Sequence, residues 1–163
     1  MNDKARRRFG LAVVDSLEAA LNVTLQLIRS DLEARMISII GQEASFARER
    51  QNAIELSRVI GRRTQVPDLM VDSNRIICLA YDPDTLPGTI SGNAETFGRM
   101  LLQWLSPEHA QRLAEAVARG AFLLLVELHS MVEERIATRA LLRNCRGSVE
   151  VHDFDASKEE LRL

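Results

Sequence analysis

The sequence predicts an α+β protein in which two strand–helix–strand units, one near each end of the chain, build a single sheet. Residues 9–14 and 122–128 are apolar runs of strand length. Each run is followed by a polar pair ending in serine, Asp15-Ser16 or His129-Ser130, which is typical of a helix start. Helical spacing of apolar residues and a second strand-like segment follow in both halves. The length of 163 residues and the apolar fraction of 46% suit one domain.

Residues 9–41 form the first unit. After Ser16, the apolar positions of the expected helix share one face: Leu17, Ala20, Leu21, Thr24, Leu25, Ile28 and Leu32. Residues 35–40 then return to strand character, and Gly41 ends that strand.

Residues 105–154 form the second half. Ser106 is a predicted N-cap, and Pro107 fits the first helical turn because its missing N–H costs nothing there. Gly120 ends this helix. The strand at residues 122–128 is apolar on both sides, a helix follows Ser130, and residues 148–154 alternate as a strand with one exposed face. We expect the charged tail, residues 155–163, to fray.

Residues 42–104 interrupt the scheme as an insertion. Residues 43–60 predict one helix, residues 74–81 a fifth strand, and residues 82–88 a loop. An insertion of this length is typical of a binding loop or lid, which we place at residues 82–96. A last helix carries four large apolar residues, Phe97, Met100, Leu101 and Trp104. These belong either to the core or to an interface with a second copy or another protein. The doubly apolar strand favours a dimer through the sheet, or coverage of the sheet by the insertion.

Two such units are the parts of a ferredoxin-like fold, a mainly antiparallel sheet with helices on one face. We expect the first and third strands to be parallel central neighbours, so that both following helices begin at the same edge. Helix N-termini favour anions. The sequence therefore predicts a small-anion site formed by Asp15, Ser16, His129 and Ser130.

Simple helix capping is the main alternative for these four residues. A Ser/His/Asp hydrolase has the right residue types, but the chain has no Gly-x-Ser-x-Gly elbow. His109, His129, His152, Cys78 and Cys145 are scattered without metal-ligand spacing, so we expect neither a metal nor a cofactor.

Composition argues against nucleic acid and membrane partners. The net charge is −2, and the local basic runs 6–8 and 62–63 have few aromatic residues near them. The apolar run after the charged N-terminus is too short for a signal peptide or a membrane span. Cys78 and Cys145 form neither a metal-ligand spacing nor a Cys-x-x-Cys pattern, so we expect reduced structural thiols and a cytoplasmic location.

Two segments resemble a known family. The segment Val13-Val14-Asp15-Ser16-Leu17-Glu18-Ala19-Ala20 and the stretch from Trp104 through Gly120 into the next strand are similar to the bacterial heat-induced general stress protein domains. The resemblance covers about half of the chain. It implies a non-enzymatic stress or interaction role and supplies no catalytic residues.

The expected function is a non-catalytic binding or protein-interaction module that self-associates. Enzyme activity is left open, although its absence is favoured. The alternatives are a ligand-sensing regulatory domain and a small enzyme that uses the Ser16, His129 and Ser130 edge.

Overall fold

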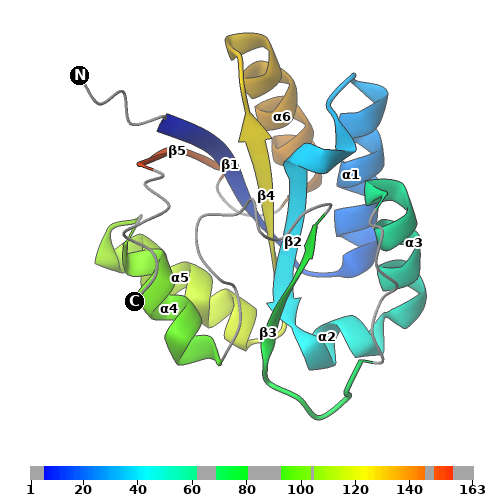
Figure 1. Cartoon of the computed structure of the whole chain (residues 1–163), viewed down its shortest axis with the longest axis vertical. Helices are drawn as coiled ribbons and strands as arrows, with labels where there is room; N and C mark the ends of the chain where they lie inside the picture. The colour runs from blue at the N-terminus through cyan, green and yellow to red at the C-terminus, as the bar shows by residue number, and fades with distance from the viewer. Residues whose placement is uncertain (1–5, 62–68, 81–92, 104, 146–148, 156–163) are drawn as a thin grey trace.

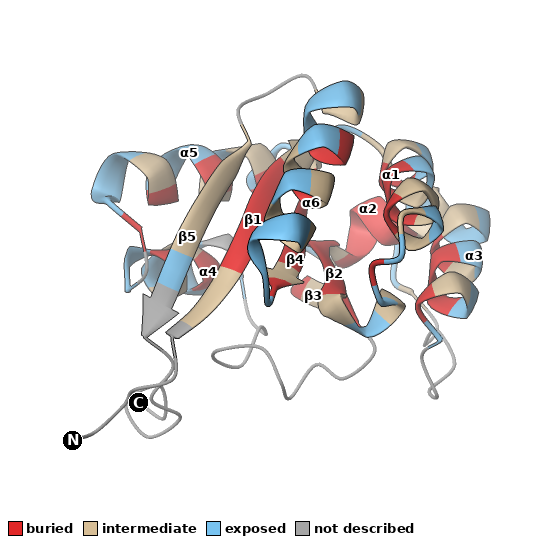
Figure 2. Cartoon of the chain, turned by 90° about the horizontal axis from the view of Figure 1, so that it is seen from above, coloured by how far each residue is buried: buried red, intermediate tan, exposed pale blue. Residues whose placement is uncertain are grey.

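A five-stranded sheet lies between two layers of helices (Figure 1, Figure 2). A computed structural model describes residues 6–61, 69–80, 93–103, 105–145 and 149–155. The expected lid and tail fall almost entirely outside these ranges, and so does Trp104.

The strand order is β3-β2-β4-β1-β5, and all neighbouring strands are antiparallel. The first unit contributes β1 (Arg6–Val14), α1 (Leu17–Arg29) and β2 (Ile37–Gln42), joined by a short 3-10 turn, Ala34–Met36. The second contributes β4 (Phe122–Leu128), α6 (Met131–Asn144) and β5 (Glu150–Asp155). These four strands have the ferredoxin-like order, and β3 (Ile76–Ala80) adds the expected fifth strand beside β2. The predicted fold class is confirmed.

The direction predicted for the central strands is wrong. β1 and β4 are neighbours, but they run antiparallel, with Val14 opposite Phe122 and Arg8 opposite Leu128. β4 lies between β1 and β2 and pairs antiparallel with both. Consequently α1 and α6 begin at opposite ends of the sheet.

Helices cover both faces of the sheet, whereas the sequence predicted one covered face. α1, α3 (Arg50–Ile60) and α6 lie on one side, and α4 (Ala94–Leu102) and α5 (Pro107–Ala118) lie on the other (Figure 2). Alternate residues of β4 belong to the two cores: Leu124 packs under the first layer and Leu123 and Leu125 under the second. The apolar character of β4 on both sides is therefore explained by coverage within one chain.

The helix predicted over residues 43–60 is two helices. α2 (Glu43–Arg48) and α3 are separated at Glu49, whose backbone leaves the helical region with φ −118° and ψ 43°. Neither proline nor glycine marks this break, so local sequence does not signal it.

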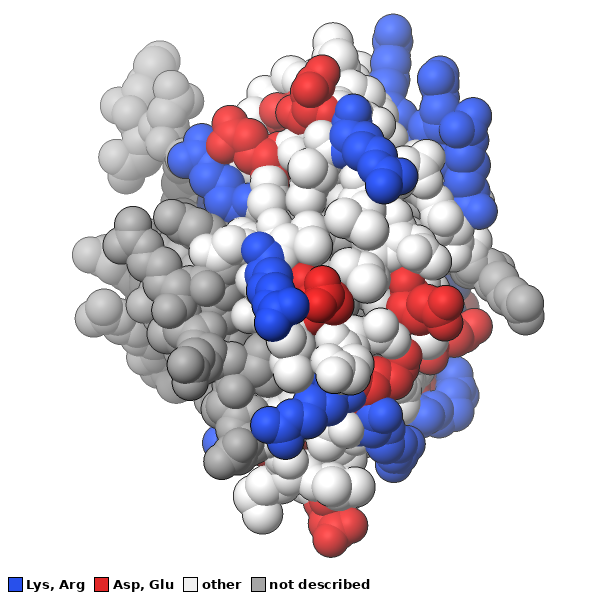
Figure 3. Space-filling model, turned by 90° about the vertical axis from the view of Figure 1, so that its right-hand side faces the viewer, with Lys and Arg blue, Asp and Glu red and all other residues white. Residues whose placement is uncertain are grey.

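The surface over α1 and α3 carries basic and acidic side chains interspersed with one another (Figure 3). No helix in the part of the chain that the structure describes combines the length and the apolar character needed to cross a membrane.

Candidate functional site

A polar hollow opens at the end of the sheet where β1 ends and β4 begins. Its volume is about 500 Å³, within the range of small-molecule pockets. The lining comes from the end of β1, from α2, from the end of α5 and from residues 120–122. The hollow therefore lies where both strand–helix–strand units and the second helical layer meet.

Gly41 permits the close packing that positions α2 at this hollow. A Cβ at residue 41 would lie 2.5 Å from Cδ1 of Phe122, a distance that real Cβ atoms do not adopt. Without it, Phe46 of α2 packs edge-on against Phe122, with ring centroids 5.0 Å apart. This contact fixes α2 against the start of β4 and buries its neighbour Ser45.

Ser45 brings an unsatisfied hydroxyl group to the hollow. The residue is 4% exposed, and its Oγ is the one buried side-chain polar atom without a hydrogen-bond partner among the described residues. Gly120, with φ 98°, leaves space beside it: a Cβ there would lie 3.5 Å from the Ser45 Oγ. An unpaired buried hydroxyl costs free energy, which a bound ligand would recover.

Two guanidinium groups and two carboxylates complete the charged lining. Arg48 and Arg119 are exposed, and neither has an ion-pair partner among the residues that the structure describes. Glu49 is already engaged, because its carboxylate accepts a hydrogen bond of 2.9 Å from the backbone N–H of Leu17. Asp15 at the end of β1 is exposed. Judged by the described residues, the site thus offers two free cations, one free carboxylate and one unsatisfied hydroxyl.

Only one of the four predicted ligand residues lies in this hollow. Asp15 lines it, whereas Ser16 is the N-cap of α1 and accepts a hydrogen bond of 3.1 Å from the N–H of Ala19. The first-turn donors at Leu17 and Glu18 are taken by the Glu49 carboxylate. The N-terminus of α1 is therefore already compensated by side chains of this chain.

His129 and Ser130 lie at the other end of the sheet, so the predicted four-residue site does not form. Ser130 caps α6 by accepting from the N–H of Glu133 at 3.1 Å, and the Glu133 carboxylate accepts from the N–H of His129 at 2.6 Å. The arrangement differs from a capping box only in that Glu133 accepts from the residue before the N-cap rather than from Ser130 itself. The His129 ring lies 3.4 Å from the Glu127 carboxylate. Capping, the alternative interpretation, accounts for both serines.

The residues predicted for an interface belong largely to the second core. Phe97 and Leu101 are buried against the sheet, and Met100 packs partly against the same cluster. The fourth, Trp104, lies outside the described residues. Phe97 and Leu101 are therefore not available to a partner.

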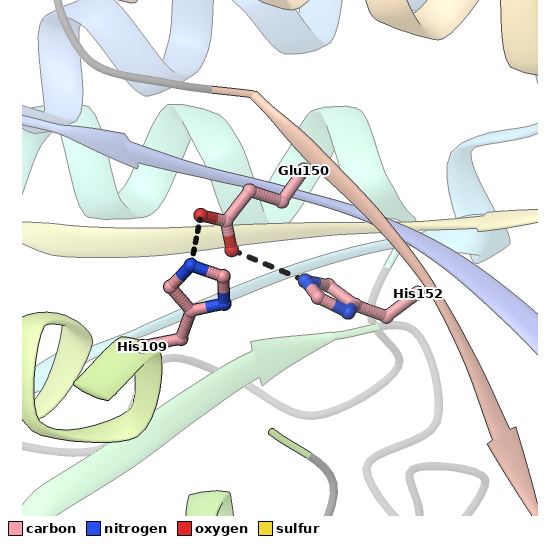
Figure 4. A group of neighbouring side chains, drawn as sticks. All are labelled: His109, Glu150 and His152. Carbon is pink, nitrogen blue, oxygen red and sulfur yellow. Dashed lines mark hydrogen bonds and ion pairs between the residues drawn. The ribbon is translucent and has the colours of Figure 1, made fainter. Parts of the chain in front are cut away.

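A second group of polar side chains joins α5 to the edge strand β5 (Figure 4). Nε2 of His109 lies 3.6 Å from Oε1 of Glu150, and Nε2 of His152 lies 3.1 Å from Oε2 of the same carboxylate. All three side chains offer a donor atom within 4.8 Å of the others, a geometry able to hold a metal ion. Sequence reasoning missed this group, although strand alternation does place Glu150 and His152 on one face.

The Glu150 carboxylate is held ionised by its neighbours. Its partial burial opposes ionisation, but the hydrogen bond from His152 and the charges of His109 and Arg112 lower the pKa of Glu150 below its usual value. An ionised carboxylate is the form that binds cations.

Comparisons with known proteins give no relative: no family model, curated protein or solved structure matches this chain. The assignment of function therefore depends on the geometry of the molecule itself.

Proposed function

We propose that this protein is a non-catalytic binding module that takes a small anionic ligand in the hollow between β1, α2 and the end of α5. The buried, unpartnered hydroxyl of Ser45 is the observation that carries the proposal. Native proteins satisfy nearly all buried polar groups, so an exception that faces a hollow points to a bound group.

The charges of the lining indicate the class of ligand. Arg48 and Arg119 suit a carboxylate or phosphate, because guanidinium groups bind planar anions by charge-assisted hydrogen bonds. Asp15 would accept a hydrogen bond from a donor elsewhere on the same ligand. The best match is a small molecule that carries an anionic group together with an amine or hydroxyl group.

The surroundings of the Ser45 hydroxyl support binding without catalysis. The described residues that line the hollow include no histidine and no cysteine, and Ser45 has no hydrogen-bonded base to activate its hydroxyl. A binding role needs only the hydroxyl and the charges.

Isothermal titration calorimetry with inorganic phosphate tests the proposal. We expect one phosphate per chain, with affinity about tenfold weaker or worse in Arg48→Gln and in Arg119→Gln. Arg58→Gln is the matched control, because Arg58 is exposed on α3, pairs with Glu55 and does not line the hollow. No saturable binding, or equal losses in all three variants, would refute the site.

A sensing or stress-related role is a further part of this proposal. It is supported by the sequence resemblance to the general stress protein domains, and a ligand site is what a regulatory domain requires. Self-association is also retained as a prediction, but α4 and α5 cover the sheet face that first suggested it. A mass measurement in solution tests self-association, and a change in that mass on addition of phosphate tests a ligand-sensing role.

A further inference from the structure

We propose that His109, Glu150 and His152 form a zinc site at the junction of α5 and β5, separate from the anion hollow. The three donors come from two elements that are far apart in the chain. His109 lies in the first turn of α5, and Glu150 and His152 lie two residues apart on β5. Figure 4 shows both imidazole rings turned toward the one carboxylate.

The fold fixes these side chains on one face. Glu150 is opposite Leu11 and His152 opposite Phe9 in the β1–β5 ladder. Phe9 and Leu11 both belong to the core under α4 and α5. Side chains directly opposite each other share a face of the sheet, so both β5 residues face α5, which carries His109.

Two of the three separations between donors are close to those of a metal polyhedron. With metal–ligand bonds of about 2.0–2.2 Å, neighbouring donors in tetrahedral or octahedral sites are about 3 to 3.5 Å apart. The two imidazole-to-carboxylate separations are 3.1 and 3.6 Å. All three donors lie within 4.8 Å of one another, so side-chain rotations can bring them around one zinc ion.

The donor types select zinc over the alkaline-earth cations. Two imidazoles and one carboxylate suit Zn²⁺ and its transition-metal neighbours, whereas Mg²⁺ and Ca²⁺ prefer oxygen ligands throughout. The side chains of His109, Glu150 and His152 are 40%, 16% and 24% exposed, so an ion can reach them from solvent. Three protein ligands leave a further coordination position for water or a ligand group.

Arg112 competes with the metal for Glu150. Its guanidinium forms an ion pair with Oε1, the same oxygen that faces His109. Arg112 is 53% exposed and lies one turn along α5, so its side chain can swing into solvent when zinc binds. This competition gives the proposal a directional test, since removing Arg112 should strengthen zinc binding.

Zinc titration calorimetry in phosphate-free buffer tests the site. We expect one zinc per chain in the wild type, with affinity reduced on the order of 100-fold in His109→Asn and His152→Asn. Arg112→Gln should bind more tightly than the wild type, and Mg²⁺ should give no saturable heat. His129→Asn is the matched control, because His129 also pairs with a glutamate but lies outside the group.

Histidine-ring NMR on the same samples separates a site from general zinc binding. The rings of His109 and His152 should shift in step with added zinc, and the ring of His129 should not. Equal zinc affinity in the wild type and His152→Asn, or weaker binding in Arg112→Gln, would overturn the proposal. The three side chains would then be only a polar network that ties β5 to α5.

Discussion

The carboxylate of Glu49 caps a helix to which it does not belong, accepting the backbone N–H of Leu17 at 2.9 Å. The weaker contact with the N–H of Glu18 is 3.4 Å long. Glu49 occupies the break between α2 and α3, so the irregular backbone there places its side chain over the start of α1. Glu49 directly follows α2, which carries Ser45 and Arg48. The hydrogen bond to Leu17 therefore also holds α2 at the edge of the hollow.

Loss of this cap should weaken folding. We expect Glu49→Ala to lower the free energy of unfolding by about 1 to 2 kcal/mol, because α1 loses both a cap and a compensating charge. Urea denaturation followed by circular dichroism measures this. Glu55→Ala is the control: Glu55 is exposed on α3 and forms an exposed ion pair with Arg58, so its loss should cost less than about 0.5 kcal/mol. Equal costs in the two variants would contradict the capping role.

Gly41 should not tolerate a methyl group. We expect Gly41→Ala to destabilise the protein by about 1 to 3 kcal/mol, because the new Cβ would overlap the Phe122 ring. Gly98→Ala in α4 is a matched control, since its Cβ would sit at an ordinary 3.5 Å from that of Ala114 and alanine favours helix. Thermal unfolding of both variants measures the difference. An unchanged melting temperature in Gly41→Ala would show that the Phe122 ring packs less closely against Gly41 of β2 than the structure indicates.

Ser45→Ala should separate binding from stability. Without ligand, we expect its free energy of unfolding to stay within about 1 kcal/mol of wild type and not to fall, because the hydroxyl has no partner to lose in the part of the chain that the structure describes. With phosphate, the rise in melting temperature that we expect for the wild type should be smaller in Ser45→Ala. A loss of more than about 2 kcal/mol in the unliganded variant would mean that the hydroxyl is structurally bonded.

Glu43 should contribute stability that disappears in acid. Burial alone would raise its pKa, but the N–H of Met70, the Ser73 hydroxyl and the Arg75 guanidinium lower it below its usual 4.5. The unfolded chain then binds the proton first, so this contribution is complete above about pH 4.5 and falls as pH drops through the folded-state pKa. Glu43→Gln should therefore be less stable at neutral pH and show a shallower acid decline in urea denaturation. An unchanged acid decline would contradict this assignment.

Local signals predicted the elements well. Ser16, Ser106 and Ser130 each begin a helix as N-caps, as the sequence indicated. The strand at 122–128 and the fifth strand were also predicted correctly, because short apolar runs of this length are typical of buried strands. These features depend on neighbouring residues alone.

Long-range placement was not predictable in the same way. Because β1 and β4 were predicted to run parallel, Ser16 and Ser130 were expected side by side. The antiparallel pairing of these strands places the two helix starts at opposite ends of the sheet. Ser45 and Arg119 meet only because α2 and α5 converge at one sheet end, and no local pattern encodes that approach. Asp15 was predicted as a ligand residue and does line the hollow, but with other neighbours than those expected.

The most direct measurement is a phosphate titration followed by backbone amide NMR. The account predicts saturable shifts of the amide signals of Ser45, Gly120 and Ala121, which line the hollow, while those of Ser130 and Met131 at the other end of the sheet stay fixed. Unchanged signals at Ser45 and Gly120 across the titration, or shifts spread evenly over both ends, would contradict it.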